Sequence, residues 1–473
     1  MDGLIDREPA LSSGLADIRT QFSVPTSFPE AVLTATELAA KRALTGHADW
    51  TDRDFATLDP RESTDLDQAF CIERSGNHII LHYAIADVAG FVAPHDAIDL
   101  EAWRRGTTIY MPDGKASLYP PQMSEGAASL LPDVERPAAV FSVRIDPAGV
   151  ASLDGAVRAV IRSRAKLTYE DVTPADLPSD FAELSNRIEL AEDKRGAARV
   201  DAPAQELQMD SAGHFILSFR PQLPAEIQNA AMSLAANLAI AELLLEHRTG
   251  LFRVMPEPEP WTIHRLRHTA KALGLVWPKQ QELKEFERGL VQGKPREAAF
   301  MAAVRRSGPK ASYAPYRDGD IPWHSAMAAT YCHATAPLRR LADRYVIEAV
   351  LQITAGGSVS DELHAAFDLL PAVMAKADEK ASQVERAVLD LAEATALQGR
   401  EGSRFSAVVT DVDERGARFQ LADPAVVGRV DDRGALPGDT ITVELVSADV
   451  AHRQIKFQRV DAAFQNRSPV GER

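Results

Sequence analysis

The distribution of apolar residues divides the chain into parts of different character. Residues 50 to about 165 alternate short apolar runs with turn signals, which predicts a mixture of strands and loops. Within this part, the apolar runs 69–72 and 78–88 are separated by Ser75-Gly76-Asn77, a pattern typical of a hairpin turn. We therefore expect a buried sheet in the first third of the chain.

After Leu184 the spacing of apolar residues becomes helical. Ser360 is followed directly by acidic residues and is expected to cap a long helix, which Pro371 should interrupt. The helices predicted in this part are 225–247, 261–273, 281–291, 296–306, 337–352 and 360–397.

From Gly402 the pattern changes to alternation with period two. Five short strands in about 58 residues match the size of an OB-fold barrel, which often binds single-stranded nucleic acid. The alternative is an unrelated small barrel used only for packing, which fold alone does not exclude.

The N-terminal 48 residues look helical, with apolar side chains that can share one face at Val32, Leu33, Leu38 and Leu44. They predict either a small helix-turn-helix or, as we favour, a strap on the main domain. The last residues after Val460 are expected to be disordered. Together the patterns predict an α+β protein with segments 1–48, 49–400, 401–460 and 461–473.

Composition narrows the class of protein. The chain has 473 residues, 45% hydrophobic and 25% charged, as in ordinary globular proteins. No apolar run approaches the roughly 18 residues of a membrane helix, and the start lacks a signal peptide pattern. Cys71 and Cys332 are the only cysteines, so we expect a cytoplasmic protein without a disulfide framework. The net charge of −16 argues against a protein that coats DNA.

An acidic run is the first candidate for chemistry. Asp59, Glu62, Asp65 and Asp67 fall in a stretch that Pro60 and polar residues mark as a loop entering the sheet. Carboxylates this close repel one another, so either the loop is solvated or a cation lies among them. Oxygen ligands spaced D-x5-D-x-D beside a buried strand suit Mg²⁺, and we favour the cation.

The second candidate is the stretch 331–345. Pro337 is expected to begin a helix, which places Arg339 and Arg340 in its first turn. Cations oppose the helix dipole there, so an anion such as phosphate should lie nearby. We favour phosphate for Arg339; for Arg340 a salt bridge, for example to Asp343, is an equal alternative.

Aromatic residues and histidines carry weaker signals. Tyr110 and Tyr169 lie beside turns, where tyrosine is usually half-buried packing; stacking on a base becomes attractive only if the metal and arginine sites exist. His82, His324 and His333 are expected to be structural.

Five segments in this order resemble the ribonuclease II/R (RNB) family of exoribonucleases: DPRESTDLDQAF, IADVAGFV, GTTIYMPD, RSRAKLTYEDV and HATAPLRRLADRY. The resemblance covers about residues 50 to 400, and the C-terminal strands resemble the RNA-binding OB-fold domain of that family.

The resemblance implies a processive 3′-to-5′ hydrolase of single-stranded RNA that releases nucleoside 5′-monophosphates with Mg²⁺, or with Mn²⁺ in its place. It implies no membrane and no protein partner. The family's pattern maps metal binding to the acidic run and the scissile phosphate to the arginine. The implied site residues are Asp59, Asp65, Asp67 and Gln68 for metal, Asp67 and Arg339 for catalysis, and Tyr110, Tyr169 and Arg340 for substrate.

The chain also departs from the family pattern. The run D-x-D-D ends here in Gln68, which can ligate but carries no charge. Ala230 and Ala231 stand where a pair of glutamates is expected, with Glu226 one turn upstream. A phenylalanine expected near 200–208 to stack on RNA is absent, and the N-terminus is too short for two cold-shock barrels, so a more open RNA channel is expected.

These departures define the alternatives to an active exoribonuclease. One is a catalytically weakened RNA-binding or regulatory protein. The other is a nuclease that prefers structured RNA or DNA.

Overall fold

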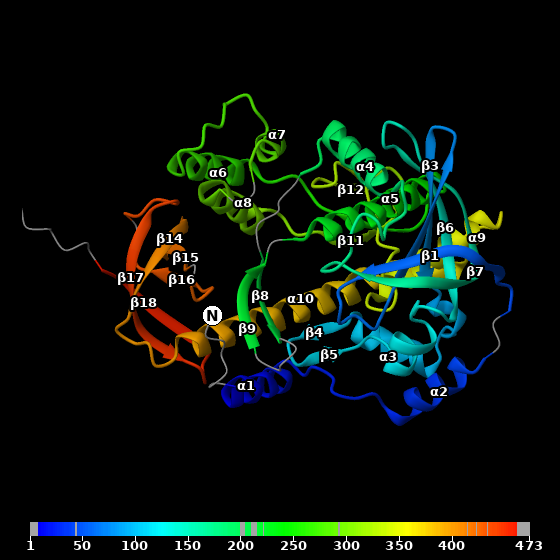
Figure 1. Cartoon of the computed structure of the whole chain (residues 1–473), viewed down its shortest axis with the longest axis horizontal. Coiled ribbons are helices and arrows are strands. Elements are labelled where there is room, and N and C mark those ends of the chain that lie inside the picture. Colours follow the sequence, from blue (N-terminus) through cyan, green and yellow to red (C-terminus); the bar gives the residue numbers. More distant parts are fainter. Residues whose placement is uncertain are drawn as a thin grey trace, which may run out of the picture.

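The computed structural model describes residues 8–42, 45–198, 204–209, 215–220, 222–291, 294–413, 415–421, 423–432 and 434–460. Its largest unit is built around a closed barrel of five strands, named here the N-terminal barrel (Figure 1). The strands of this barrel are β1 (Ala48–Asp59), β2 (Gln68–Ser75), β3 (His78–Ala86), β6 (Glu135–Ile145) and β7 (Ala151–Thr168).

The N-terminal barrel confirms the predicted sheet and adds its closure. Neighbouring strands run antiparallel, and the circle closes because β1 pairs in parallel with β7, with Ala56 opposite Ala165. The hairpin predicted between the two apolar runs is β2–β3. Phe55, Phe70 and Phe141 are almost completely buried, so side chains fill the interior as expected for a small barrel.

Helices cover the outside of the N-terminal barrel. α5 (Pro224–Glu246) packs on β7 and on α4 (Phe181–Arg195), and α9 (Leu341–Thr354) also packs on β7. By length and composition α5 could cross a membrane, although the sequence was expected to contain no such run. Half of its apolar window is buried in the fold, and Met232, Ala236 and Ile240 belong to the main core. α5 is therefore a core helix.

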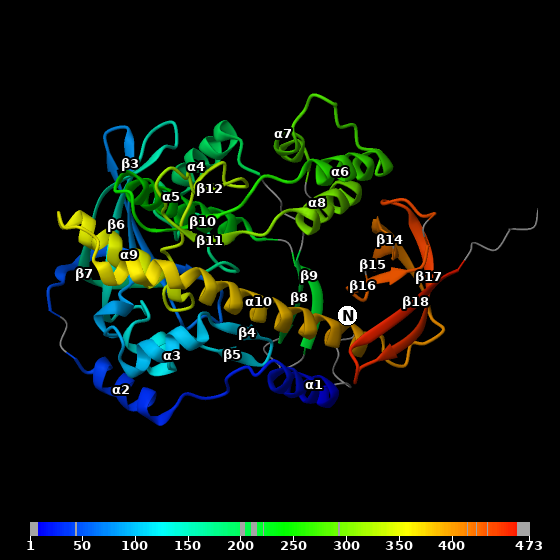
Figure 2. The same ribbon diagram turned by 180° about the vertical axis from the view of Figure 1, so that it is seen from behind.

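α10 (Asp361–Leu397) joins the two ends of the molecule, as Figure 2 shows from behind. The predicted cap is confirmed, because Ser360 Oγ accepts a hydrogen bond from Leu363 N. The predicted interruption is wrong, since the helix continues through Pro371. One straight element therefore extends from α9 to the C-terminal strands.

The two N-terminal helices contact different parts of the fold. α1 (Glu8–Gln21) packs on α10, and α2 (Glu30–Ala40) packs on α3 (Ala97–Arg105), so each lies on the main unit as a strap would. The face predicted for α2 is right at Val32 and wrong at Leu38. Val32 and Ala39 are buried with Thr36, at helical spacing, whereas Leu38 is 67% exposed. Leu44 lies outside the described residues.

The C-terminal strands form the predicted five-stranded unit, named here the C-terminal barrel. Their order is β16-β15-β14-β17-β18, all antiparallel, and β16 approaches β18 so that the sheet almost closes. Phe405, Phe419 and Phe457 form its core, to which Leu397 of α10 contributes. The predicted tail lies outside the described residues. The strands are β14 (Arg404–Asp413), β15 (Gly416–Leu421), β16 (Val427–Val430), β17 (Thr440–Asp449) and β18 (Gln454–Val460).

Three helices form a small unit beside the C-terminal barrel: α6 (Pro260–Ala272), α7 (Leu283–Arg288) and α8 (Pro295–Ser307). Stacked rings of Trp277 and Phe286, 4.9 Å apart, lie in its own core.

The β8–β9 hairpin falls in a part of the chain whose pattern is helical. The remaining elements are β4 (Ile109–Met111), β5 (Gly114–Ala116), β8 (Ala204–Met209), β9 (Phe215–Arg220), β10 (Leu251–Val254), β11 (Ser312–Pro315), β12 (Trp323–His324), β13 (Ala329–Thr330) and the short helical turns Val88–Gly90 and Met123–Ala127.

Candidate active site

The residues that the sequence singled out meet in one cavity of about 1100 Å³ at the rim of the N-terminal barrel. They come from segments as far apart as β1 and the turn before α9, so only the tertiary fold brings them together. The eight predicted residues that line the cavity are Asp59, Asp65, Asp67, Gln68, Tyr110, Tyr169, Arg339 and Arg340.

Asp59 is the last residue of β1, at the start of the acidic loop. Its Oδ2 is buried without a hydrogen-bond partner, and burial raises the pKa of the carboxyl to about 7. Lys166 of β7 supports the loop that follows, because its Nζ donates to the carbonyls of Arg61 and Ser63, each at 2.7 Å. The loop is therefore held in place.

Asp67 lies one residue before β2 and is only 3% exposed. Its Oδ1 accepts a hydrogen bond from Leu338 N at 2.7 Å. Its Oδ2 lies 3.2 Å from Arg339 Nε but has no partner in hydrogen-bond geometry. Burial raises the pKa of Asp67 to about 7, although Arg339 opposes the shift. Asp67 thus links the acidic loop to the arginine segment.

Asp65, between these two, has donors at both oxygens. Lys115 Nζ of β5 lies 2.7 Å from Oδ1, and the Tyr110 hydroxyl donates to Oδ2 at 3.2 Å. Lys115 also lies 3.2 Å from Glu125. The Tyr110 side chain is anchored by its hydroxyl while the residue stays 53% exposed, so its ring is accessible. The sequence patterns did not single out Lys115.

The predicted position of the arginines in a first helical turn is wrong. α9 begins at Leu341, and Arg340 is extended, with φ −132° and ψ 121°. The reason is long-range, because residue 340 bridges to Thr107, and the buried carboxylate of Asp343 accepts from Ala336 N at 2.8 Å. Both arginines therefore precede the helix.

The two arginines have different surroundings. Arg340 pairs with Asp343 at 2.7 Å, which is the salt-bridge alternative. The Arg339 side chain is 46% exposed at the cavity and has Asp67 beside it. Arg339 is therefore the guanidinium that can meet an incoming anion, and Arg340 chiefly stabilises the turn.

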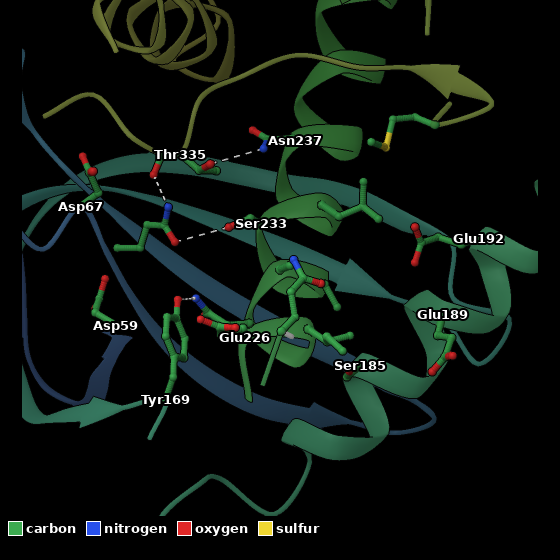
Figure 3. Close-up of a pocket in the computed structure, with 18 of the residues that line it drawn as sticks. Asp59, Asp67, Tyr169, Ser185, Glu189, Glu192, Glu226, Ser233, Asn237 and Thr335 are labelled. Carbon is green, nitrogen blue, oxygen red and sulfur yellow. Dashed lines mark hydrogen bonds between the residues drawn. The ribbon is translucent and has the colours of Figure 1, made fainter. Parts of the chain in front are cut away.

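A hydrogen-bond network supports the turn that precedes α9 (Figure 3). Gln68 Nε2 donates to the carbonyl of Thr335 at 2.6 Å, and its Oε1 accepts from the hydroxyl of Tyr83 at 2.6 Å and, at 3.4 Å, from that of Ser233. Both ends of the Gln68 amide are thus engaged. Asn237 of α5 adds a bond from Nδ2 to Thr335 Oγ1 at 3.3 Å.

Asn237 was visible in the sequence as part of NAAMSLAAN, and its Oδ1 accepts from Ala334 N at 3.0 Å. Its role could not be inferred, because its partners lie about a hundred residues away. The same holds for Tyr83 and Ser233, which have no motif of their own.

Tyr169 lies beside Asp59, whose carbonyl accepts from Tyr169 N at 3.2 Å. Its hydroxyl accepts a hydrogen bond from Asn229 Nδ2 at 2.8 Å. Burial, with the nearby Asp59 carboxylate, raises the pKa of Tyr169 to about 12. The tyrosine therefore stays neutral and fixed at the wall of the cavity.

The opposite wall of the cavity is formed by α4, which directs Ser185, Glu189 and Glu192 toward it (Figure 3). Glu226 also lines the cavity, but its carboxylate accepts from Leu223 N at 2.8 Å and pairs with Arg220. It therefore caps α5.

The methyl groups of Ala230 and Ala231 lie at the cavity where the family pattern has glutamates. The stretch expected to carry a stacking phenylalanine is described only from residue 204, where β8 begins.

The three histidines set aside as structural have other partners. His82 Nδ1 contacts Ser142 Oγ at 2.9 Å on the barrel wall, and His333 Nδ1 contacts the Tyr313 hydroxyl at 3.0 Å. Burial lowers the pKa of His324 to about 4, which keeps it neutral.

Two of the aspartates offer oxygen ligands that fit a hard divalent cation. Asp59 and Asp67 each hold a buried carboxylate oxygen that lacks a donor, and such oxygens suit Mg²⁺ or Mn²⁺. Among the described residues, no three side chains of His, Cys, Asp or Glu converge as a ligand group. Asp59 and Asp67 are therefore the residues that could hold a cation.

Comparison with protein families gives two matches. A model described as RNB domain matches residues 47–355, and one described as RNase II-type exonuclease C-terminal S1 domain matches residues 403–460.

Curated relatives include Ribonuclease R of Aquifex aeolicus, which is 26% identical over 440 residues, with 87% of this chain and 62% of that protein covered. Ribonuclease R of Thermotoga maritima is 26% identical over 461 residues, covering 89% and 64%. The chain thus spans less than two thirds of the length of these relatives.

Among solved structures, Mycoplasma genitalium RNase R in complex with ribose methylated single-stranded RNA has a TM-score of 0.84 at 20% identity and covers 94% of this chain and 77% of that one. Yeast Ssd1, described as a pseudonuclease, has a TM-score of 0.66 at 14% identity and covers 85% and 53%. At these identities the likeness shows the fold.

Proposed function

The chain belongs to the RNB-domain family, and from this membership we propose that it is a 3′-to-5′ exoribonuclease. It hydrolyses single-stranded RNA to nucleoside 5′-monophosphates with Mg²⁺ or Mn²⁺. The observation that carries the proposal is the meeting of Asp59, Asp65, Asp67 and Arg339 in one cavity.

In this reaction, the oxygen of a water molecule bonds to the last phosphorus of the chain. The water loses one proton to solvent as it bonds. The bond from that phosphorus to the 3′-oxygen of the preceding nucleotide breaks, the electron pair goes to this oxygen, and a proton from solvent joins it. The released nucleotide keeps its 5′-phosphate. A divalent cation held by Asp59 and Asp67 would supply Lewis-acid charge at the phosphate.

The protein's own groups position the reactants. Arg339 contacts the scissile phosphate and stabilises the charge that develops on it. Asp67 holds this arginine and the Leu338 amide, so the guanidinium is oriented before RNA binds. The rings of Tyr110 and Tyr169, fixed through their hydroxyls, stack on nucleotides near the 3′ end.

The domains have different roles. Residues 49–400 form the catalytic part, and residues 401–460 bind RNA upstream of the cut. The short N-terminal segment acts as a strap. The cytoplasm is the compartment that we propose.

The rival function is an RNA-binding protein with weakened catalysis, motivated by Gln68, Ala230 and Ala231. The likeness to a pseudonuclease agrees with it at the level of fold alone. The retained aspartates and Arg339 favour the active enzyme.

The test is digestion of a 5′-labelled RNA with a single-stranded 3′ tail. Asp67→Asn should lower the rate by about 10³-fold, because it removes the charge that binds the cation and orients Arg339. Asp318→Asn is a matched control on an exposed ion pair with Arg248 and should keep wild-type activity. Equal rates for Asp67→Asn and wild type would refute the site. Binding of RNA without shortening of the labelled strand at saturating Mg²⁺ and Mn²⁺ would favour the rival.

A further inference from the structure

Asp65 differs from the other two aspartates in the charge around it. Lys115 Nζ and the Tyr110 hydroxyl contact its two oxygens, at 2.7 Å and 3.2 Å. Asp59 and Asp67 instead each keep a buried oxygen without a donor. The carboxylate oxygens that still lack a hydrogen-bond donor are therefore those of Asp59 and Asp67.

Lys115 is held between two carboxylates. Its side chain is 19% exposed, and Glu125 Oε1 lies 3.2 Å from the same Nζ that contacts Asp65. Glu125 in turn accepts from Thr64 Oγ1 at 2.9 Å, on the acidic loop itself. The lysine is thus part of the loop's support.

Gln68 removes a further negative charge from the site. Its amide is neutral, and its two ends are used by the Thr335 carbonyl and the Tyr83 hydroxyl. A second cation would need negative ligands that this position does not offer.

The charges at the site leave room for one divalent cation. On the acidic loop and the side chains in contact with it, four carboxylates, counted in their ionised form, face three basic side chains, which leaves one negative charge. One divalent cation and one phosphodiester bring the total to zero, whereas a second divalent cation would leave an excess of two positive charges. The charged groups counted are Asp59, Asp65, Asp67, Glu125, Lys115, Lys166 and Arg339.

We propose that Lys115 is a built-in counter-charge for Asp65 and that, together with uncharged Gln68, it limits the site to one divalent cation held by Asp59 and Asp67. The inference rests on the proposed function, since it requires that a cation binds in this cavity. Lys115 is a positioning residue, because it acts through Asp65, and through Asp65 on Tyr110.

The experiment counts bound Mn²⁺ by electron paramagnetic resonance titration without RNA. Wild type should bind one ion. Lys115→Met should bind a second ion, and the first should bind on the order of tenfold more tightly, because a full positive charge close to the ligands is lost. Glu125→Gln keeps Lys115 and should bind one ion. Lys294→Met, which removes an exposed lysine that pairs with Glu297, is the matched control and should also bind one ion.

Each outcome of the titration either supports or overturns the proposal of one divalent cation. Two ions or none in wild type, or one ion in folded Lys115→Met, overturns the proposal. Lys115→Gln, which keeps a polar side chain, carries the same expectation if the methionine variant does not fold. A protein that binds one Mn²⁺ but releases no mononucleotides would lose the proposed function and keep this inference, so the two failures are distinguishable.

Discussion

The C-terminal barrel and the rim of the N-terminal barrel differ in how their acidic side chains are paired. In the C-terminal barrel, acidic and basic side chains of the same unit pair near the surface: Arg404 with Glu444, Arg429 with Asp413, and Arg459 with Asp432. At the rim of the N-terminal barrel, Asp59 and Asp67 are buried, and each has one carboxylate oxygen that accepts no hydrogen bond.

Under the proposed function, this difference separates RNA binding from chemistry. Paired charges at a surface contribute little to stability and set up no strong local field. Buried, uncompensated carboxylates cost stability and are retained where a cation or a substrate completes them. We therefore expect variants of the N-terminal barrel to change turnover, and loss of the C-terminal barrel to change affinity.

The largest effect is expected at Arg339. Arg339→Ala should lower kcat by about 10²- to 10³-fold with little change in RNA affinity, because its contact strengthens as charge develops on the phosphate. Arg429→Ala in the C-terminal barrel is the matched control and should change kcat less than about twofold. Single-turnover digestion measures both. Equal losses of kcat in the two variants would contradict the proposed difference between the two barrels.

The next effect concerns how the free energy of unfolding depends on pH when no divalent cation is present. The pKa values of Asp59 and Asp67 rise from 3.8 to about 7 on folding, chiefly through burial. Between these pH values the folded state keeps protons that the unfolded chain has lost. The free energy of unfolding should therefore fall by several kcal/mol as pH rises from about 4 to about 7, since each pKa unit corresponds to about 1.4 kcal/mol.

Denaturant unfolding at pH 5 and pH 8 in EDTA measures this loss. Saturating Mg²⁺ should remove it at pH 8, because the cation binds only the folded state. Asp67→Asn should flatten the pH dependence. An unchanged curve in that variant would show that the loss arises elsewhere.

A smaller effect is expected on removing the C-terminal barrel. A chain that ends at Arg400 should bind a long single-stranded RNA about 10- to 100-fold more weakly, since a linked binding module is lost. Turnover of a tetranucleotide should stay close to wild type, which also controls for folding, because this removal exposes Leu397. A parallel fall in tetranucleotide turnover would indicate a structural role for the barrel.

The smallest effect is expected at Gln68. Gln68→Glu replaces the group that donates to the Thr335 carbonyl and should lower the free energy of unfolding by about 1–3 kcal/mol. Tyr83→Phe removes one bond to the same amide and should cost about 1 kcal/mol. Unfolding in urea measures both. A Gln68→Glu variant of unchanged stability with a lower Mg²⁺ requirement would make this position a ligand.

Local features of the fold could be predicted from the sequence. The β2–β3 hairpin, the Ser360 cap and the five C-terminal strands depend on residues close in sequence. The acidic loop and Arg339 could be singled out because unpaired charges beside buried elements need a partner.

Features that depend on distant contacts could not be predicted. The start of α9 was misplaced because Asp343 and the bridge to residue 107 hold the preceding turn outside the helix. Closure of the N-terminal barrel requires β1 to pair with β7, which lies about a hundred residues later in the chain. Lys115 has no motif, and only the fold places it beside Asp65.

The hydrogen bond from Leu338 N to Asp67 joins residues 271 positions apart. During synthesis the aspartates leave the ribosome long before the amide and the guanidinium that complete their site. We therefore expect an unfinished chain to be harmless to the messenger RNA that encodes it. A truncated protein ending at residue 330 should accordingly leave RNA intact.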